Sequence, residues 1–143
     1  MKERVRAILI TPGGNLLTIK RVRPQMKPYW VLPGGRVEPG DAGLEAALLR
    51  EIEEELAGRA TIGPLIHVLE TDDERQYFFL ARIDSWNPAH RSGPEFTDPS
   101  RGQYVVEEVP LAHLDRIAVK PEEIARLLAT RADVFRRHAD AAI

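Results

Sequence analysis

The sequence GGRVEPGDAGLEAALLREIEEELAG, residues 34–58, is the stretch on which the predicted fold depends. It begins with a glycine-rich turn, continues into a predicted helix and carries a dense group of carboxylates. Six acidic residues lie between positions 41 and 56, against a single base, Arg50. Because the 143 residues of the chain have a formal net charge of only −2, this excess of acid is local.

Helical spacing gathers three of these carboxylates. Residues three and four positions apart lie on one face of a helix, so Glu51, Glu54 and Glu55 project together. A second row is apolar and is spaced to dock on a sheet: Leu44, Leu48, Ile52 and Leu56. Carboxylates at such spacing repel one another, and a hard divalent cation such as Mg2+ would reverse that repulsion. The alternative interpretation is a solvated acidic helix face.

The stretch resembles the Nudix box, the signature of hydrolases that act on nucleoside diphosphates linked to another group. The family pattern is a Gly, five residues, a Glu, seven residues and then Arg-Glu-hydrophobic-any-Glu-Glu, followed by any residue and a Gly. Gly35 matches the first position, and REIEEE, residues 50–55, matches the core. The approach to the motif, WVLPGGRVEPGD at residues 30–41, is also similar.

Three positions depart from the family pattern. Asp41 stands where the family has its first Glu, eight residues rather than seven separate it from Arg50, and Ala57 takes the place of a Gly. We place the additional residue at 42–43, before the helix, where it leaves the carboxylates in register. Gly58 is predicted to close the helix in the left-handed conformation.

The resemblance implies a pyrophosphohydrolase that is expected to require Mg2+, with Mn2+ as an alternative metal. The resemblance implies four metal ligands in this stretch, namely the backbone carbonyl of Gly35 and the side chains of Glu51, Glu54 and Glu55. Glu51 and Glu54 are the expected catalytic carboxylates, and Arg50 is expected to orient them. The general base is left open between Glu51 and Glu95.

The longest irregular stretch, residues 84–102, is expected to contribute a further ligand. A loop of this length is uncommon in a compact domain and is often functional. The Nudix family often adds one carboxylate to the metal site from a loop at this place. Glu95 is the first candidate and Asp98 the second, and a surface loop without a functional role is the alternative.

A small-molecule nucleotide is the expected partner; the resemblance leaves nucleoside triphosphates, ADP-ribose, nucleotide sugars and dinucleoside polyphosphates open. Arg21 and Arg23 are the candidate substrate-binding cations, because a guanidinium can bind two phosphate oxygens at once. Trp30 is a candidate to stack on a base or ribose. The alternatives are a solubilising strand edge for the arginines and core packing for Trp30.

The remaining elements predict an α/β fold. Strands are expected at residues 5–11, 16–22, 61–71, 76–83 and 104–109, and a C-terminal helix is expected to begin at Pro121. The first two strands should form a hairpin. Mixed strands with one helix in the middle and one at the end indicate α/β layers. The resemblance specifies a Nudix-type α/β/α sandwich with a mixed β-sheet, a box helix and a C-terminal helix, in a single domain over residues 1–143.

Composition restricts the environment and the partners. The absence of cysteine excludes disulfides and thiolate metal sites and fits a cytoplasmic location. The N-terminal apolar run is too short to span a membrane, and the small net charge argues against a nucleic-acid polymer or an anionic membrane as partner. A homodimer is left open. So are a nucleotide-binding regulatory module with little turnover and an acidic face that binds a protein.

The loop assignment can be tested directly. If Glu95 supplies a metal ligand, Glu95→Gln should lower the turnover number strongly, whereas Asp98→Asn should do little. Steady-state kinetics of the two variants measures this, and equal, negligible effects would assign the whole loop to the surface.

Overall fold

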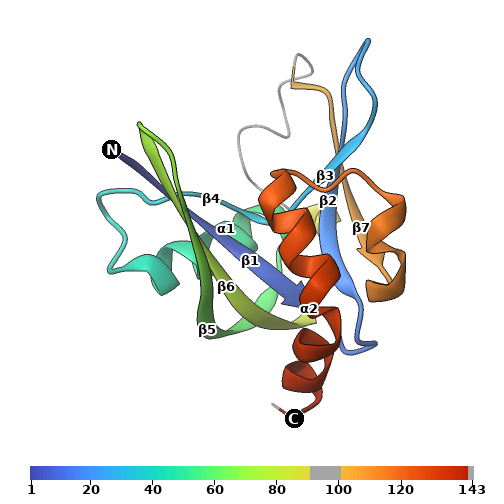
Figure 1. Cartoon of the computed structure of the whole chain (residues 1–143). Coiled ribbons are helices and arrows are strands. Elements are labelled where there is room, and N and C mark those ends of the chain that lie inside the picture. Colours follow the sequence, from blue (N-terminus) through green and yellow to red (C-terminus); the bar gives the residue numbers. More distant parts are fainter. Residues whose placement is uncertain (91–100, 142–143) are drawn as a thin grey trace.

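The computed structural model describes residues 1–90 and 101–141, which form a mixed seven-stranded sheet with helices on both faces (Figure 1). The strands are β1 (Lys2–Ile10), β2 (Leu16–Val22), β3 (Tyr29–Val31), β4 (Gly34–Arg36), β5 (Arg59–Glu70), β6 (Glu74–Ser85) and β7 (Gln103–Val109). The α-helices are α1 (Leu44–Leu56) and α2 (Glu122–Ala141), and 3-10 helices span Pro88–His90 and Leu111–Arg116. Within these residues no helix is long and apolar enough to cross a membrane.

Alternation along β1 produces two core layers. Successive side chains of a strand point to opposite faces of the sheet. Val5, Ala7 and Leu9 pack with the apolar row of α1 on one face. Ile8 and Ile10 pack with buried residues of α2 on the other. The predicted α/β/α sandwich is therefore confirmed, with the box helix and the C-terminal helix on opposite sides of the sheet (Figure 1).

The sheet splits between β1 and β2. The two strands pair at Ile10 and Leu16, as the predicted hairpin requires, and then diverge. Beyond this point β4 pairs with residues 4–6 of β1, whereas β3 and β7 pair with β2. The chain crosses from one half of the sheet to the other at residues 32–33, between β3 and β4. The divergence leaves room for a cavity between the two halves.

Gly34 allows β4 to lie against β1. Its φ of +149° is a conformation that residues with a side chain rarely adopt. A Cβ at this position would lie 2.0 Å from the carbonyl oxygen of Val5, so there is no space for one. Because the obstacle is backbone, neither strand can relieve the contact by rotating a side chain.

Helix α1 ends differently from the prediction. Ala57, not Gly58, takes the left-handed conformation, with a φ of 45° and an N–H that donates to the Glu53 carbonyl at 2.9 Å. Gly58 serves packing instead, because a Cβ there would lie 2.8 Å from Cδ1 of Ile83 in β6. The prediction for Gly58 is therefore wrong. The residue without a side chain is needed against β6, and Ala57 accepts a strain of about 1–2 kcal/mol.

We expect Gly34→Ala to lower the free energy of unfolding by about 2 kcal/mol or more, because backbone strain adds to overpacking. Gly40→Ala is the control, since nothing lies within 4 Å of a Cβ built at Gly40. Urea denaturation of both variants measures the difference. A Gly34→Ala variant as stable as the control would contradict the close approach of β4 to β1.

Candidate active site

A cavity of about 520 Å3 opens where the sheet splits. Its walls come from β1, β2, β3, β4, β7 and α1. The basic lining residues are Arg4, Arg6, Arg21, Arg36 and Arg101, the acidic ones are Glu38, Glu51, Glu54 and Glu55, and the aromatic ones are Tyr29 and Tyr104. The carboxylates predicted from the helix face thus share one cavity with Arg21 and with four further arginines.

Two of the three carboxylates are buried against β4. Glu51 is 8% exposed and Glu55 is 6% exposed, whereas Glu54 is partly exposed. The Gly34 N–H donates to Oε1 of Glu55 at 2.6 Å. A Cβ at Gly35 would lie 2.5 Å from the carboxyl carbon of Glu51, so the missing side chain of Gly35 leaves the space that this carboxyl group fills.

Arg50 connects the turn before α1 to the carboxylates of the helix. Its Nε and Nη2 each donate to Asp41 at 2.9 Å, and Nη2 also donates to the Arg36 carbonyl at 2.9 Å. Its Nη1 donates to Glu51 at 3.0 Å and to Glu54 at 3.3 Å. The hydrogen bonds with Asp41 raise the pKa of Arg50 above its usual range, and the guanidinium in turn lowers the pKa of Asp41. Arg50 thus contacts both the turn and two carboxylates of the helix, and its orienting role stays a prediction.

The arginines of the sheet are held in different ways. Arg6 donates from Nη1 to the Leu32 carbonyl at 3.2 Å. Burial lowers the pKa of Arg6, and the nearby Glu55 carboxylate opposes that effect. Arg21 donates to the Arg101 carbonyl, and its guanidinium lies 3.7 Å from the centre of the Tyr104 ring. Both arginines line the cavity.

Two predicted substrate-binding residues lie apart from these carboxylates. Trp30 does not line the cavity; its Nε1 donates to Glu107 at 3.2 Å, and its ring packs against the α2 side of the core. Tyr29, its neighbour on β3, lines the cavity instead, because adjacent strand residues face opposite ways. Arg23 also lies outside the lining, with its Nε 3.4 Å from the Arg101 carbonyl. Glu95 and Asp98 lie outside the described residues.

Two cations of β1 belong to the cavity in addition to the predicted residues. Arg4 and Arg6 line the cavity but were not among the predicted site residues. A signal for them was present, since they alternate with Val5 and Ala7 and therefore share a strand face. No local pattern indicates that β4 pairs beside them and brings the carboxylates of α1 into the same cavity.

The residues present fit a hard divalent cation by their chemistry. Such ions take oxygen ligands, chiefly carboxylates and backbone carbonyls, and Glu51, Glu54, Glu55 and Gly35 all line the cavity. In residues 1–90 and 101–141 no three His, Cys, Asp or Glu side chains are grouped as ligands around one point. The donor set is suitable, and the ligand assignment stays a prediction.

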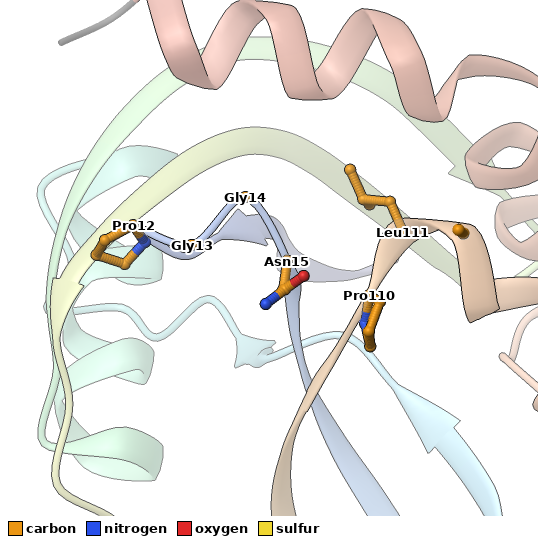
Figure 2. A pocket seen from close by; sticks show the side chains of 7 residues that line it. Pro12, Gly13, Gly14, Asn15, Pro110 and Leu111 are labelled. Carbon is orange, nitrogen blue, oxygen red and sulfur yellow. The ribbon is translucent and has the colours of Figure 1, made fainter.

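Two further cavities differ in character. One, of about 290 Å3, adjoins the first through Arg6 and Val31, and its other lining residues are Leu32, Gln76, Phe78, Lys120 and Pro121. Another, of about 370 Å3, lies at the β1–β2 turn and is lined by Pro12, Gly13, Gly14, Asn15, Pro110, Leu111 and Ala112 (Figure 2). There Asn15 and the Thr11 hydroxyl both donate to Glu108 at 2.8 Å, which ties the turn to β7. Its lining has no ionisable side chain and therefore supplies no acid or base.

A model of the NUDIX domain matches residues 1–136 of this chain. The chain belongs to the NUDIX family. A Bacillus subtilis (strain 168) protein provisionally named an 8-oxo-dGTP diphosphatase is 39% identical over 75 residues, which cover 50% of this chain and 48% of the relative. The CTP pyrophosphohydrolase of Escherichia coli (strain K12) is 38% identical over 66 residues, which cover 46% of this chain and 48% of the relative. The chain thus spans about half the length of these relatives.

Solved structures confirm the Nudix fold. The NUDIX hydrolase from Nitrosomonas europaea matches with a TM-score of 0.67 at 15% identity, over 97% of this chain and 89% of that one. The MutT NUDIX hydrolase from Burkholderia pseudomallei matches with a TM-score of 0.55 at 27% identity, over 87% of this chain and 94% of that one. Helix α1 of this chain is therefore a Nudix box helix.

The contact between Asp41 and Arg50 in this Nudix box predicts a pH dependence of stability. The pKa of Asp41 is lowered first by the Arg50 hydrogen bonds and then by the Glu38 N–H. A carboxyl whose pKa is lower in the folded chain stabilises the fold above its unfolded pKa, which is about 3.9. That stabilisation is lost as the pH falls through the lowered pKa.

We therefore expect Asp41→Asn to be less stable than the parent at neutral pH, and the difference to shrink as the pH falls below about 3.9. Unfolding midpoints measured across an acidic pH series test this, with Asp72→Asn in the exposed β5–β6 turn as control. A difference between Asp41→Asn and the parent that stays constant over the series would contradict the ion pair.

Proposed function

We propose that this chain hydrolyses a phosphoanhydride bond in a nucleoside diphosphate linked to another group, with Mg2+ or Mn2+ as the required metal. The observation that carries the proposal is the single cavity in which carboxylates of α1 lie opposite arginines of the sheet. Cleavage of a phosphoanhydride requires positive charge at the phosphate oxygens and a base for the attacking water. The cavity contains both kinds of group.

Nucleoside triphosphates are the substrates we propose to test first. The names of both relatives refer to hydrolysis of nucleoside triphosphates. A triphosphate brings several negative charges, and five arginines line the cavity. Because each guanidinium can bind two oxygens, this set suits a chain of phosphates. ADP-ribose, nucleotide sugars and dinucleoside polyphosphates are the next group.

We propose the following roles for the residues. Glu51, Glu54, Glu55 and the Gly35 carbonyl would hold the metal, which when bound neutralises phosphate oxygens and lowers the pKa of water. Glu51 accepts the proton of the attacking water, and Glu95 is the alternative base. Arg6 and Arg21 bind phosphate oxygens from the strands of the sheet. Asp41 and Arg50 hold the carboxylates without touching substrate.

The adjoining 290 Å3 cavity is suited to the nucleoside part of the substrate. Its walls include the apolar side chains of Val31, Leu32 and Phe78, and ligand sites are commonly apolar with a few polar groups. Gln76 and Lys120 supply such polar groups at its edge. Because Arg6 lines both cavities, a base in the smaller one would place its phosphates beside the carboxylates.

A regulatory module that binds a nucleotide with little turnover is the second candidate. It is favoured by the contacts of Arg50, whose Nη1 already donates to Glu51 and Glu54. The two candidates differ in one measurement, because both bind nucleotide and only the enzyme releases product. Separate titrations of Mg2+ and nucleotide, followed by an assay for phosphate or nucleotide release, distinguish them.

We expect Glu54→Gln to lose most of the activity of the parent, by about 100-fold or more, since loss of a supporting residue alone costs 10- to 100-fold. It should also lose most of the thermal stabilisation that Mg2+ gives the parent, because that gain follows RT ln(1 + [L]/Kd). In EDTA the two proteins should differ by about 0.5 kcal/mol or less, the value of an i,i+4 ion pair with Arg50.

Glu53→Gln is the matched control, since Glu53 is exposed on the same helix and does not line the cavity. It should keep both the activity and the response to Mg2+. The proposed function would be refuted if the melting temperature of the parent did not change with Mg2+ or Mn2+ and the parent released no phosphate or nucleotide from any substrate of the panel.

A further inference from the structure

Two departures from the Nudix pattern meet in one hydrogen-bonded arrangement. Asp41 replaces a Glu, and eight residues rather than seven separate it from Arg50. Both oxygens of Asp41 nevertheless contact one edge of the guanidinium: Oδ1 accepts from Nε and Oδ2 from Nη2, each at 2.9 Å. Two parallel charge-assisted bonds fix the plane of a guanidinium as well as its position. The short side chain therefore makes the full two-bond contact.

Asp41 is also fixed to the turn that precedes it. Its N–H donates to the Glu38 carbonyl at 3.0 Å, and its Oδ2 accepts from the Glu38 N–H at 2.8 Å. A Glu at this position would carry its carboxylate one C–C bond, about 1.5 Å, further from the backbone. It could not meet the Glu38 N–H and the Arg50 edge together in the turn as it stands.

The start of helix α1 is fixed at Gly43, on the C-terminal side of Asp41. The Gly43 carbonyl accepts the N–H of Ala47 at 3.0 Å, which makes Gly43 the first residue tied into α1. One residue, the exposed Ala42, then lies between Gly43 and the fixed Asp41. Removing Ala42 would draw the turn toward the helix start by up to about 3.8 Å, the distance between successive Cα atoms. The carboxylate of Asp41 would then leave the Arg50 edge.

We propose that Asp41 is a positioning residue that acts through Arg50 on Glu51 and Glu54, and that Ala42 compensates for the shortness of the Asp41 side chain. An Arg side chain has five N–H donors in a rigid fork. Asp41 and the Arg36 carbonyl take those of Nε and Nη2, which turns Nη1 toward the two carboxylates. The short side chain at position 41 is therefore matched by the additional residue between position 41 and the start of α1.

A double-mutant cycle tests the match. Its members are the parent, Asp41→Glu, deletion of Ala42, and both changes together. In EDTA each single change should lower the unfolding midpoint, and the double variant, which has the family's Glu and seven-residue spacing, should recover most of the loss. Equal or greater loss in the double variant would overturn the proposal. If the deletion alone does not fold, the double variant must still be more stable than Asp41→Glu.

The effect of Asp41 on catalysis rests on the proposed function, and it is measured separately through kcat and KM. Asp41→Asn should reduce kcat about 10- to 100-fold with little change in KM, because the residue orients carboxylates without contacting substrate. The same recovery of kcat should appear in the double variant of the cycle. Asp72→Asn, exposed in the β5–β6 turn, should match the parent. An unchanged kcat in Asp41→Asn would overturn the positioning role.

The proposed function and the match between Asp41 and Ala42 can be refuted independently. A parent without activity on any nucleotide would refute the proposed function, while the unfolding midpoints in EDTA would still decide the match between Asp41 and Ala42. Additive losses of stability in the cycle would refute the match even in an active enzyme.

Discussion

The absence of side chains at Gly34 and Gly35 is the constraint on which the site depends. Gly34 lets the backbone of β4 lie beside β1, and its N–H then reaches the carboxylate of Glu55. Gly35 leaves the space that the carboxyl group of Glu51 fills. A side chain at Gly34 would separate β4 from β1, and one at Gly35 would displace the carboxyl group of Glu51. The carboxylates are thus placed by the backbone of β4, and β4 is placed by the split in the sheet.

Burial of acidic groups is costly, and the surrounding groups show how this chain offsets it. A buried charge without a partner loses several kcal/mol of hydration, so it must be hydrogen-bonded or paired. Glu55 accepts the Gly34 N–H, and Glu51 accepts an N–H of Arg50. Arg6 lies close enough to Glu55 for the carboxylate to counteract the effect of burial on the pKa of Arg6. The acids therefore depend on cations from both the helix and the sheet.

Local periodicity predicted the helix and its acidic face, and the apolar row of α1 packs as spacing four requires. What local patterns could not give was the pairing of distant segments. Trp30 and Tyr29 are adjacent aromatics, and which of the two lines the cavity depends on which face of β3 is turned toward it. Gly58 looked like a helix terminus because of its intrinsic preference, but its contact with Ile83 comes from β6. Arg6 reaches the site only through the register of β1 with β4.

Arg50 and a divalent cation would compete for the same two carboxylates. The Nη1 of Arg50 already contacts Glu51 and Glu54, and the guanidinium would repel an additional positive charge placed beside them. Asp41 and the Arg36 carbonyl hold the other two nitrogens, at 2.9 Å in each contact. The guanidinium is therefore held by its Nε and Nη2 edge, which is turned away from Glu51 and Glu54. A fixed cation can orient the carboxylates and limit their mutual repulsion without closing over them, so the turn at Asp41 determines how much of Glu51 and Glu54 stays available to the cavity.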